Sequence, residues 1–167
     1  WVLHVDGTGQ VIWQENYGTP FNDAGNAHLT TGADGSIFIA TGLEVNANDD
    51  HAPRLIKLDA EGGVLWQQTY GPARNTMIYV VQEVFPGGDL ITAGSAYNIN
   101  NFLSGILIRA TSEGDSLWMR EYVYYDADVA AGRGAFRDVQ PTPDGGFIAV
   151  GVALGVAGFY GQDVWVV

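Results

Sequence analysis

Short apolar runs, separated by polar turns rich in glycine, recur along the chain. Ile37–Ala40 and Phe147–Val150 are two of them, and each follows an Asp-Gly pair that begins at Asp34 or Asp144. Most of their residues are β-branched or aromatic, which favours strands, and they do not alternate with polar residues. A continuous apolar run of this length indicates a strand buried on both faces. We therefore predict sheets that pack against other sheets.

One unit of about 53 residues occurs three times, and each copy carries a tryptophan followed four residues later by a tyrosine. The tryptophans lie 53 and 52 residues apart, at Trp13, Trp66 and Trp118, and the tyrosines are Tyr17, Tyr70 and Tyr122. The repeats cover approximately residues 1–53, 54–105 and 106–162, and residues 163–167 start a further copy. Because such periods belong to repeat architectures, we interpret residues 1–167 as a single repeat domain, a segment of a longer protein.

Each repeat contains two hairpin signals. The first turn lies at residues 6–9, 59–63 and 111–115, and the second at 34–35, 87–88 and 144–145. Asp-Gly and Gly-Gly pairs allow the positive φ that tight hairpins need. Two hairpins in a unit of this length are typical of a propeller blade. We predict an all-β fold: a β-propeller-like array of four-stranded antiparallel blades with about three repeats. A closed barrel and a β-helix are alternatives with a shorter rhythm.

The segment 55–71, Leu-Ile-Lys-Leu-Asp-Ala-Glu-Gly-Gly-Val-Leu-Trp-Gln-Gln-Thr-Tyr-Gly, resembles the repeats of secreted bacterial β-propeller proteins found on Bacteroidota-like cells. It is also distantly similar to the tryptophan-docking motif of quinoprotein propellers, which is one residue longer. The resemblance implies an extracellular or cell-surface protein whose repeated tryptophans join neighbouring blades. It also implies that the Asp-Gly-Gly hairpins are inner and the tryptophan hairpins outer. The third copy departs at Ala110 and Thr111, where leucine and aspartate are expected.

Charge and composition reduce the number of partner classes that the sequence allows. Nineteen acidic residues against seven basic ones give a net charge of −12, which repels phosphate backbones, so we predict no nucleic-acid partner. No apolar run reaches the roughly 18 residues of a membrane span, so we predict no membrane insertion. The absence of cysteine excludes disulfides, thiolate zinc sites and cysteine nucleophiles.

No set of residues indicates catalysis. Asp6 and Asp59 precede turn glycines, where carboxylates cap turns, and we favour that role over acid–base chemistry. The histidines are scattered, no Gly-x-Ser-x-Gly elbow occurs, and we predict no catalytic residue and no cofactor. Carboxylates in two loops are candidates for Ca²⁺, although we favour solvated loops because a calcium-loop spacing is missing. They are Asp49, Asp50, Asp126 and Asp128.

Two loops that break the repeat are the best candidates for ligand recognition, because they combine aromatic and amide side chains outside the regular pattern. Their candidate residues are Tyr97, Asn98, Asn100, Asn101, Phe102, Phe159 and Tyr160.

Three functions are compatible with the sequence. The first is a non-catalytic surface or secreted module that binds proteins or glycans, or forms part of a surface assembly. The second is a fragment of a propeller enzyme, such as a quinoprotein dehydrogenase or a glycan-cleaving enzyme. The third is a subunit that self-associates through open strand edges to complete a propeller or a fibre. We favour the first, because regular repeats and strong acidity accompany no catalytic set.

Overall fold

A computed structural model describes residues 1–19, 24–44, 51–71, 75–97, 102–123, 133–154 and 162–167 of the chain. Within these ranges the regular structure is entirely β, with thirteen strands in four antiparallel sheets and no helix. The all-β prediction is therefore confirmed. No helix in the described ranges is long and apolar enough to cross a membrane.

The strands follow one another in chain order within the sheets. The first sheet holds β1 (Val2–Val5) and β2 (Val11–Glu15). The second holds β3 (Ala24–Thr31), β4 (Ile37–Glu44), β5 (His51–Leu58) and β6 (Val64–Thr69). The third holds β7 (Met77–Val84), β8 (Asp89–Tyr97), β9 (Leu103–Ala110) and β10 (Ser116–Tyr122). The fourth holds β11 (Arg133–Pro141), β12 (Phe147–Leu154) and β13 (Gln162–Val166).

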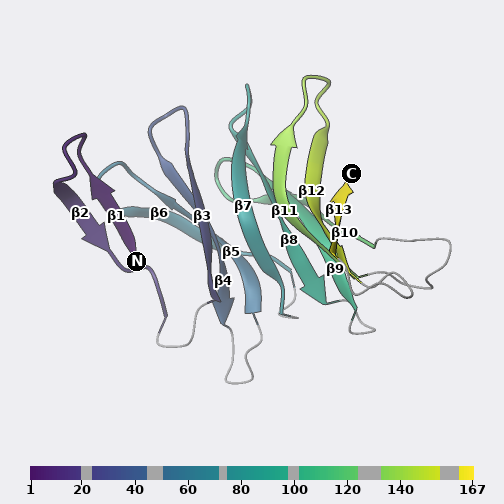
Figure 1. Cartoon of the computed structure of the whole chain (residues 1–167). Helices are drawn as coiled ribbons and strands as arrows, with labels where there is room; N and C mark the ends of the chain where they lie inside the picture. The colour runs from purple at the N-terminus through teal and green to yellow at the C-terminus, as the bar shows by residue number, and fades with distance from the viewer. Residues whose placement is uncertain (20–23, 45–50, 72–74, 98–101, 124–132, 155–161) are drawn as a thin grey trace.

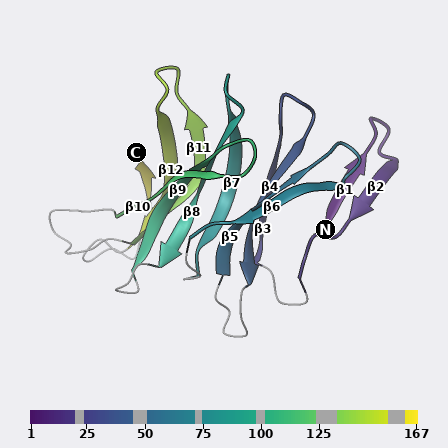
Figure 2. The ribbon, with the colours of Figure 1, turned by 180° about the vertical axis from the view of Figure 1, so that it is seen from behind.

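The four sheets stand face to face in a row (Figures 1 and 2). The strands β3, β7 and β11 contact one another along this row. We call the hairpins that they begin the inner hairpins, and the tryptophan-bearing hairpins β1–β2, β5–β6 and β9–β10 the outer hairpins. Polar contacts connect neighbouring inner hairpins. The Val81 N–H donates to His28 Nδ1 at 3.3 Å, and the Ala33 N–H donates to Glu83 Oε2 at 2.9 Å.

The hydrophobic core lies between neighbouring sheets rather than in one centre. Ile39, Ile56 and Leu58 of the second sheet pack against Val2 and Trp13 of the first. A larger cluster joins the second sheet to the third; it includes Phe38, Leu55, Ile78, Leu90 and Ile106. A third joins the third sheet to the fourth and includes Val80, Ile91, Leu107, Phe136 and Val139. The second and third sheets therefore each pack against a neighbour on both faces.

Burial follows from this stacking. The run Ile37–Ala40 was predicted to be buried on both faces, and its residues are buried or nearly so. The same prediction is wrong for Phe147–Val150, because Ile148 and Val150 keep 47% and 37% of their surface exposed. The third sheet covers only one face of β12, so the other face remains open. A strand's own sequence does not reveal how many neighbours its sheet has.

The outer turns share one design. Asp6 accepts hydrogen bonds through Oδ1 from the N–H groups of Thr8 (2.8 Å) and Gln10 (2.9 Å), and Asp59 receives the corresponding bonds in the second copy. In the third copy Thr111 Oγ1 takes the place of the carboxylate and accepts from the Asp115 N–H at 3.1 Å. A hydroxyl therefore replaces the expected aspartate without loss of the turn, since both groups accept from the backbone.

Candidate functional site

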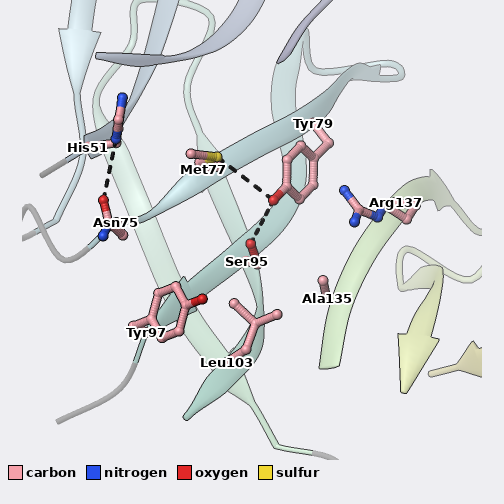
Figure 3. A pocket seen from close by; sticks show the side chains of 9 residues that line it. All are labelled: His51, Asn75, Met77, Tyr79, Ser95, Tyr97, Leu103, Ala135 and Arg137. Carbon is pink, nitrogen blue, oxygen red and sulfur yellow. Dashed lines mark hydrogen bonds between the residues drawn. The ribbon is translucent and has the colours of Figure 1, made fainter. Parts of the chain in front are cut away.

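A pocket of about 470 Å³ opens between β7, β8 and β11, and it is the candidate functional site (Figure 3). Its volume lies within the range of small-molecule sites. The described residues that line it are His51, Asn75, Met77, Tyr79, Ser95, Tyr97, Leu103, Ala135 and Arg137. The pocket lies at the end of the third sheet opposite the turn between β7 and β8. Met77, which begins β7, pairs there with Ser95, and Tyr97, which ends β8, pairs with Leu103.

A network of polar contacts positions the side chains around the pocket. The hydroxyls of Tyr79 and Ser95 share a hydrogen bond of 2.8 Å, and the Tyr79 hydroxyl also lies 3.9 Å from Met77 Sδ. The guanidinium carbon of Arg137 lies over the Tyr79 ring, 4.4 Å from its centre. His51 Nδ1 and Asn75 Oδ1 are 3.3 Å apart on the opposite wall. Tyr79 is thus fixed at its hydroxyl and covered on its ring by a cation.

Both Tyr79 and Arg137 occupy the extra residue of a β-bulge on an inner strand. On β7, Ile78 pairs with Gly94 and Val80 with Ala93, which leaves Tyr79 outside the register. The same irregularity leaves Arg137 unpaired on β11, between Phe136 and Asp138. Bulges of this kind redirect side chains and are frequent beside functional sites. The two bulges bring side chains from neighbouring sheets into contact.

The glycine opposite each bulge makes it possible. A Cβ added to Gly94 would lie 1.9 Å from the Met77 carbonyl oxygen, and one added to Gly151 would lie 2.0 Å from that of Ala135. No side chain fits at such distances, so both positions require glycine. Gly94 lies on β8 and Gly151 on β12, the second strands of their inner hairpins, and the role of each is to let the bulged strand approach closely.

The repeated tryptophans and tyrosines join each outer hairpin to the turn of the next one. Trp13 Nε1 donates to the Ala60 carbonyl at 3.0 Å, and the Tyr17 hydroxyl donates to the Gly62 carbonyl at 2.6 Å. One sheet further, Trp66 Nε1 donates to the Ser112 carbonyl at 3.2 Å, and the Tyr70 hydroxyl to that of Gly114 at 2.8 Å. Burial raises the pKa of Tyr70 well above its ordinary value, with Asp115 adding to the effect, so this phenol remains a donor.

The third pair contacts the fourth sheet through its aromatic rings. The Trp118 ring meets Phe147 edge-on, with centres 5.9 Å apart, and Tyr122 meets Phe136 at 5.7 Å. All six repeated aromatic residues therefore lie between sheets, where they contribute to packing.

Of the loop residues predicted to bind a ligand, Tyr97 lines the pocket, while Phe102 is half-buried beside the start of β9 and is not in the wall. The other ligand candidates, Asn98, Asn100, Asn101, Phe159 and Tyr160, lie outside the described residues. So do the four calcium candidates, Asp49, Asp50, Asp126 and Asp128. Among the described residues, no group of three or more His, Asp or Glu side chains is placed to hold a metal ion.

The turn carboxylates are held in the ionised form. Hydrogen bonds from Thr8 and the turn backbone lower the pKa of Asp6, and bonds from Thr142 and Gly146 lower that of Asp144. Bonds from Ser36, helped by Lys57, lower the pKa of Asp34 to about 2. A general acid needs the opposite shift, so these three carboxylates are poor proton donors near neutral pH.

Sequence reasoning missed Tyr79 and Arg137. Both belong to segments whose neighbours read as ordinary core strands, and no rule of composition marks a bulge. The only available signal was the glycine at the end of the mainly apolar run that follows the second hairpin turn, at Gly94 and Gly151. Comparison with known proteins adds no assignment: no protein-family model matches the chain, and no curated protein matches it significantly.

Proposed function

We propose that the sheets are blades of a β-propeller and that the chain acts as a non-catalytic binding module for a glycan or protein ligand outside the cell. Three features support the architecture. The strands of each sheet follow one another in chain order, the inner strands contact one another, and the outer turns receive the preceding tryptophan and tyrosine. In propellers, sheets that repeat in this way are arranged around a centre, which leaves only short and protected sheet edges.

The pocket is the observation that carries the binding function. Tyr79 and Arg137 occupy the same bulged position of two successive repeats, and with Tyr97 they gather in the wall of one pocket. Aromatic and arginine side chains beside hydrogen-bonding groups are the composition of recognition sites. The turn carboxylates with lowered pKa values lie at the other end of the sheets and do not line the pocket. The described residues of the pocket therefore favour ligand binding over acid–base catalysis by a pair of carboxylates.

A binding assay on a panel of soluble oligosaccharides and peptides tests this function. The informative variant is Tyr97→Ala, and Phe85→Ala is its control, because Phe85 is 67% exposed and lies beyond the opposite end of β7. We expect at least one ligand to bind wild-type protein and the Phe85 variant equally, and the Tyr97 variant at least about 10-fold more weakly, as for a central aromatic contact.

Two results would contradict the proposal. One is that no member of the panel binds, or that binding is indifferent to Tyr97→Ala. The other is chemical change in the ligand: mass spectrometry after prolonged incubation should recover it intact, and cleavage or oxidation would establish catalysis instead.

A further inference from the structure

Arg137 differs from Lys57 and Arg109 in its polar surroundings. Lys57 Nζ lies 3.4 Å from Asp34, and Arg109 lies 2.9 Å from Asp89, so each has a carboxylate beside it. Within the described residues no carboxylate pairs with Arg137, which is exposed and contacts the Tyr79 ring. A guanidinium that contacts a ring through its face keeps its N–H edges available, and those edges match a carboxylate in two parallel hydrogen bonds.

The described part of the pocket wall carries no carboxylate. The chain has 19 acidic residues, yet no Asp or Glu is among the described residues that line the pocket. The same pocket is lined by hydrogen-bonding groups: the hydroxyls of Tyr79 and Tyr97, the amide of Asn75 and the imidazole of His51. A positive group beside several neutral donors and acceptors suits a ligand with one carboxylate and several hydroxyls.

We propose that the pocket binds an acidic sugar residue, with its carboxylate on the Arg137 guanidinium and its hydroxyls on the neutral polar groups. This inference rests on the proposed binding function and names the ligand class of the same site. A pocket of about 470 Å³ is large enough for one or two sugar rings. The bulges on β7 and β11 form the site, because they bring Arg137 of the fourth sheet over the Tyr79 ring of the third.

The negative charge of the whole chain does not prevent this. The net charge of −12 belongs to the whole chain, and at about 0.15 M salt charges more than roughly 8 Å apart are largely screened. A carboxylate in direct contact with Arg137 is much closer than that, so the local attraction dominates at physiological ionic strength.

Titration calorimetry with D-glucuronate and D-glucose provides the test, because the two sugars differ mainly in the carboxylate. Acetate is a third probe, which has the carboxylate without the ring. We expect wild-type protein to bind glucuronate about 10-fold or more tightly than either, because glucose lacks the charged hydrogen-bonded pair and acetate lacks the sugar hydroxyls. Arg137→Gln should abolish this preference, and Arg137→Lys, which keeps the charge without the fork, should retain part of it.

The matched control is Arg133→Gln, because Arg133 is an exposed arginine on the same strand that does not line the pocket. It removes the same charge and should change glucuronate affinity less than about twofold, since exposed distant charges are screened. Both arginine side chains are exposed, so we expect each variant to fold, and circular dichroism is the check.

The outcomes separate the two proposals. If glucose binds as tightly as glucuronate and Arg137→Gln changes neither, the acidic-sugar inference is overturned while a glycan site remains. Acetate binding as tight as glucuronate would overturn the sugar part and favour carboxylates such as peptide C-termini. If none of the three probes binds at millimolar concentration, the acidic-sugar inference fails, and the oligosaccharide and peptide panel then decides the binding function separately.

Discussion

Gly114→Ala should destabilise the protein more than the same change at Gly35, and the difference measures the docking of Trp66. Both glycines have positive φ, +87° and +82°, so alanine suffers the same backbone penalty of about 1–2 kcal/mol at each. Around Gly35 no atom lies within 4 Å of the added Cβ. At Gly114 the added Cβ would lie 3.1 Å from the Trp66 ring. Overpacking of this kind adds about 1–3 kcal/mol.

Urea unfolding followed by far-ultraviolet circular dichroism measures these free energies. Gly114→Ala should exceed Gly35→Ala by about 1–3 kcal/mol, which corresponds to a further loss of roughly 2–12 °C in Tm for a chain of this size. Adding Trp66→Ala should remove the excess, because the ring that the new methyl group meets is then absent. Equal losses at Gly114 and Gly35, or an excess that persists without the Trp66 ring, would refute this account of how the sheets are joined.

Three further predictions concern single residues. Tyr70→Phe removes the donor to the Gly114 carbonyl and should cost about 1–2 kcal/mol in urea unfolding; no change would show that this bond is dispensable. Gly151→Ala should cost at least about 2 kcal/mol and weaken ligand binding, because its Cβ collides with β11, whereas Gly87→Ala, in open space, should do neither. The pKa of Asp34 is lowered from 3.8 to about 2, so its contribution to stability is present above pH 4 and is lost as the pH falls towards 2. Asp34→Asn should therefore flatten the acid-induced loss of stability in that interval, and an unchanged slope would contradict the hydrogen bonding assigned to this carboxyl.

The parts of the fold that repeat were predictable from the sequence. Turn carboxylates such as Asp6 and Asp59 were predictable, because an aspartate at the start of a glycine-containing turn accepts hydrogen bonds from the backbone of that same turn. The stacked sheets followed from continuous apolar runs such as Ile37–Ala40, which need cover on both faces. Thr111 shows that such rules tolerate a change of residue when the new group makes the same hydrogen bond.

The parts that depend on long-range register were not predictable. Tyr79 and Arg137 meet because two strands from different sheets each carry one extra residue, and that irregularity follows from backbone approach at Gly94 and Gly151 rather than from local propensity. Exposure of Ile148 likewise depends on which neighbour covers its sheet. Loop composition pointed to Tyr97 but could not supply the strand residues that complete the pocket.

A crystal structure from crystals grown in the presence of D-glucuronate tests the central claim, that the bulged residues of β7 and β11 form a binding site. We predict density for the sugar in the pocket, with its carboxylate within hydrogen-bond distance of the Arg137 guanidinium and Tyr79 hydrogen-bonded to Ser95. Strands β7 and β11 paired without bulges, or glucuronate bound elsewhere while this pocket stays closed, would contradict the claim.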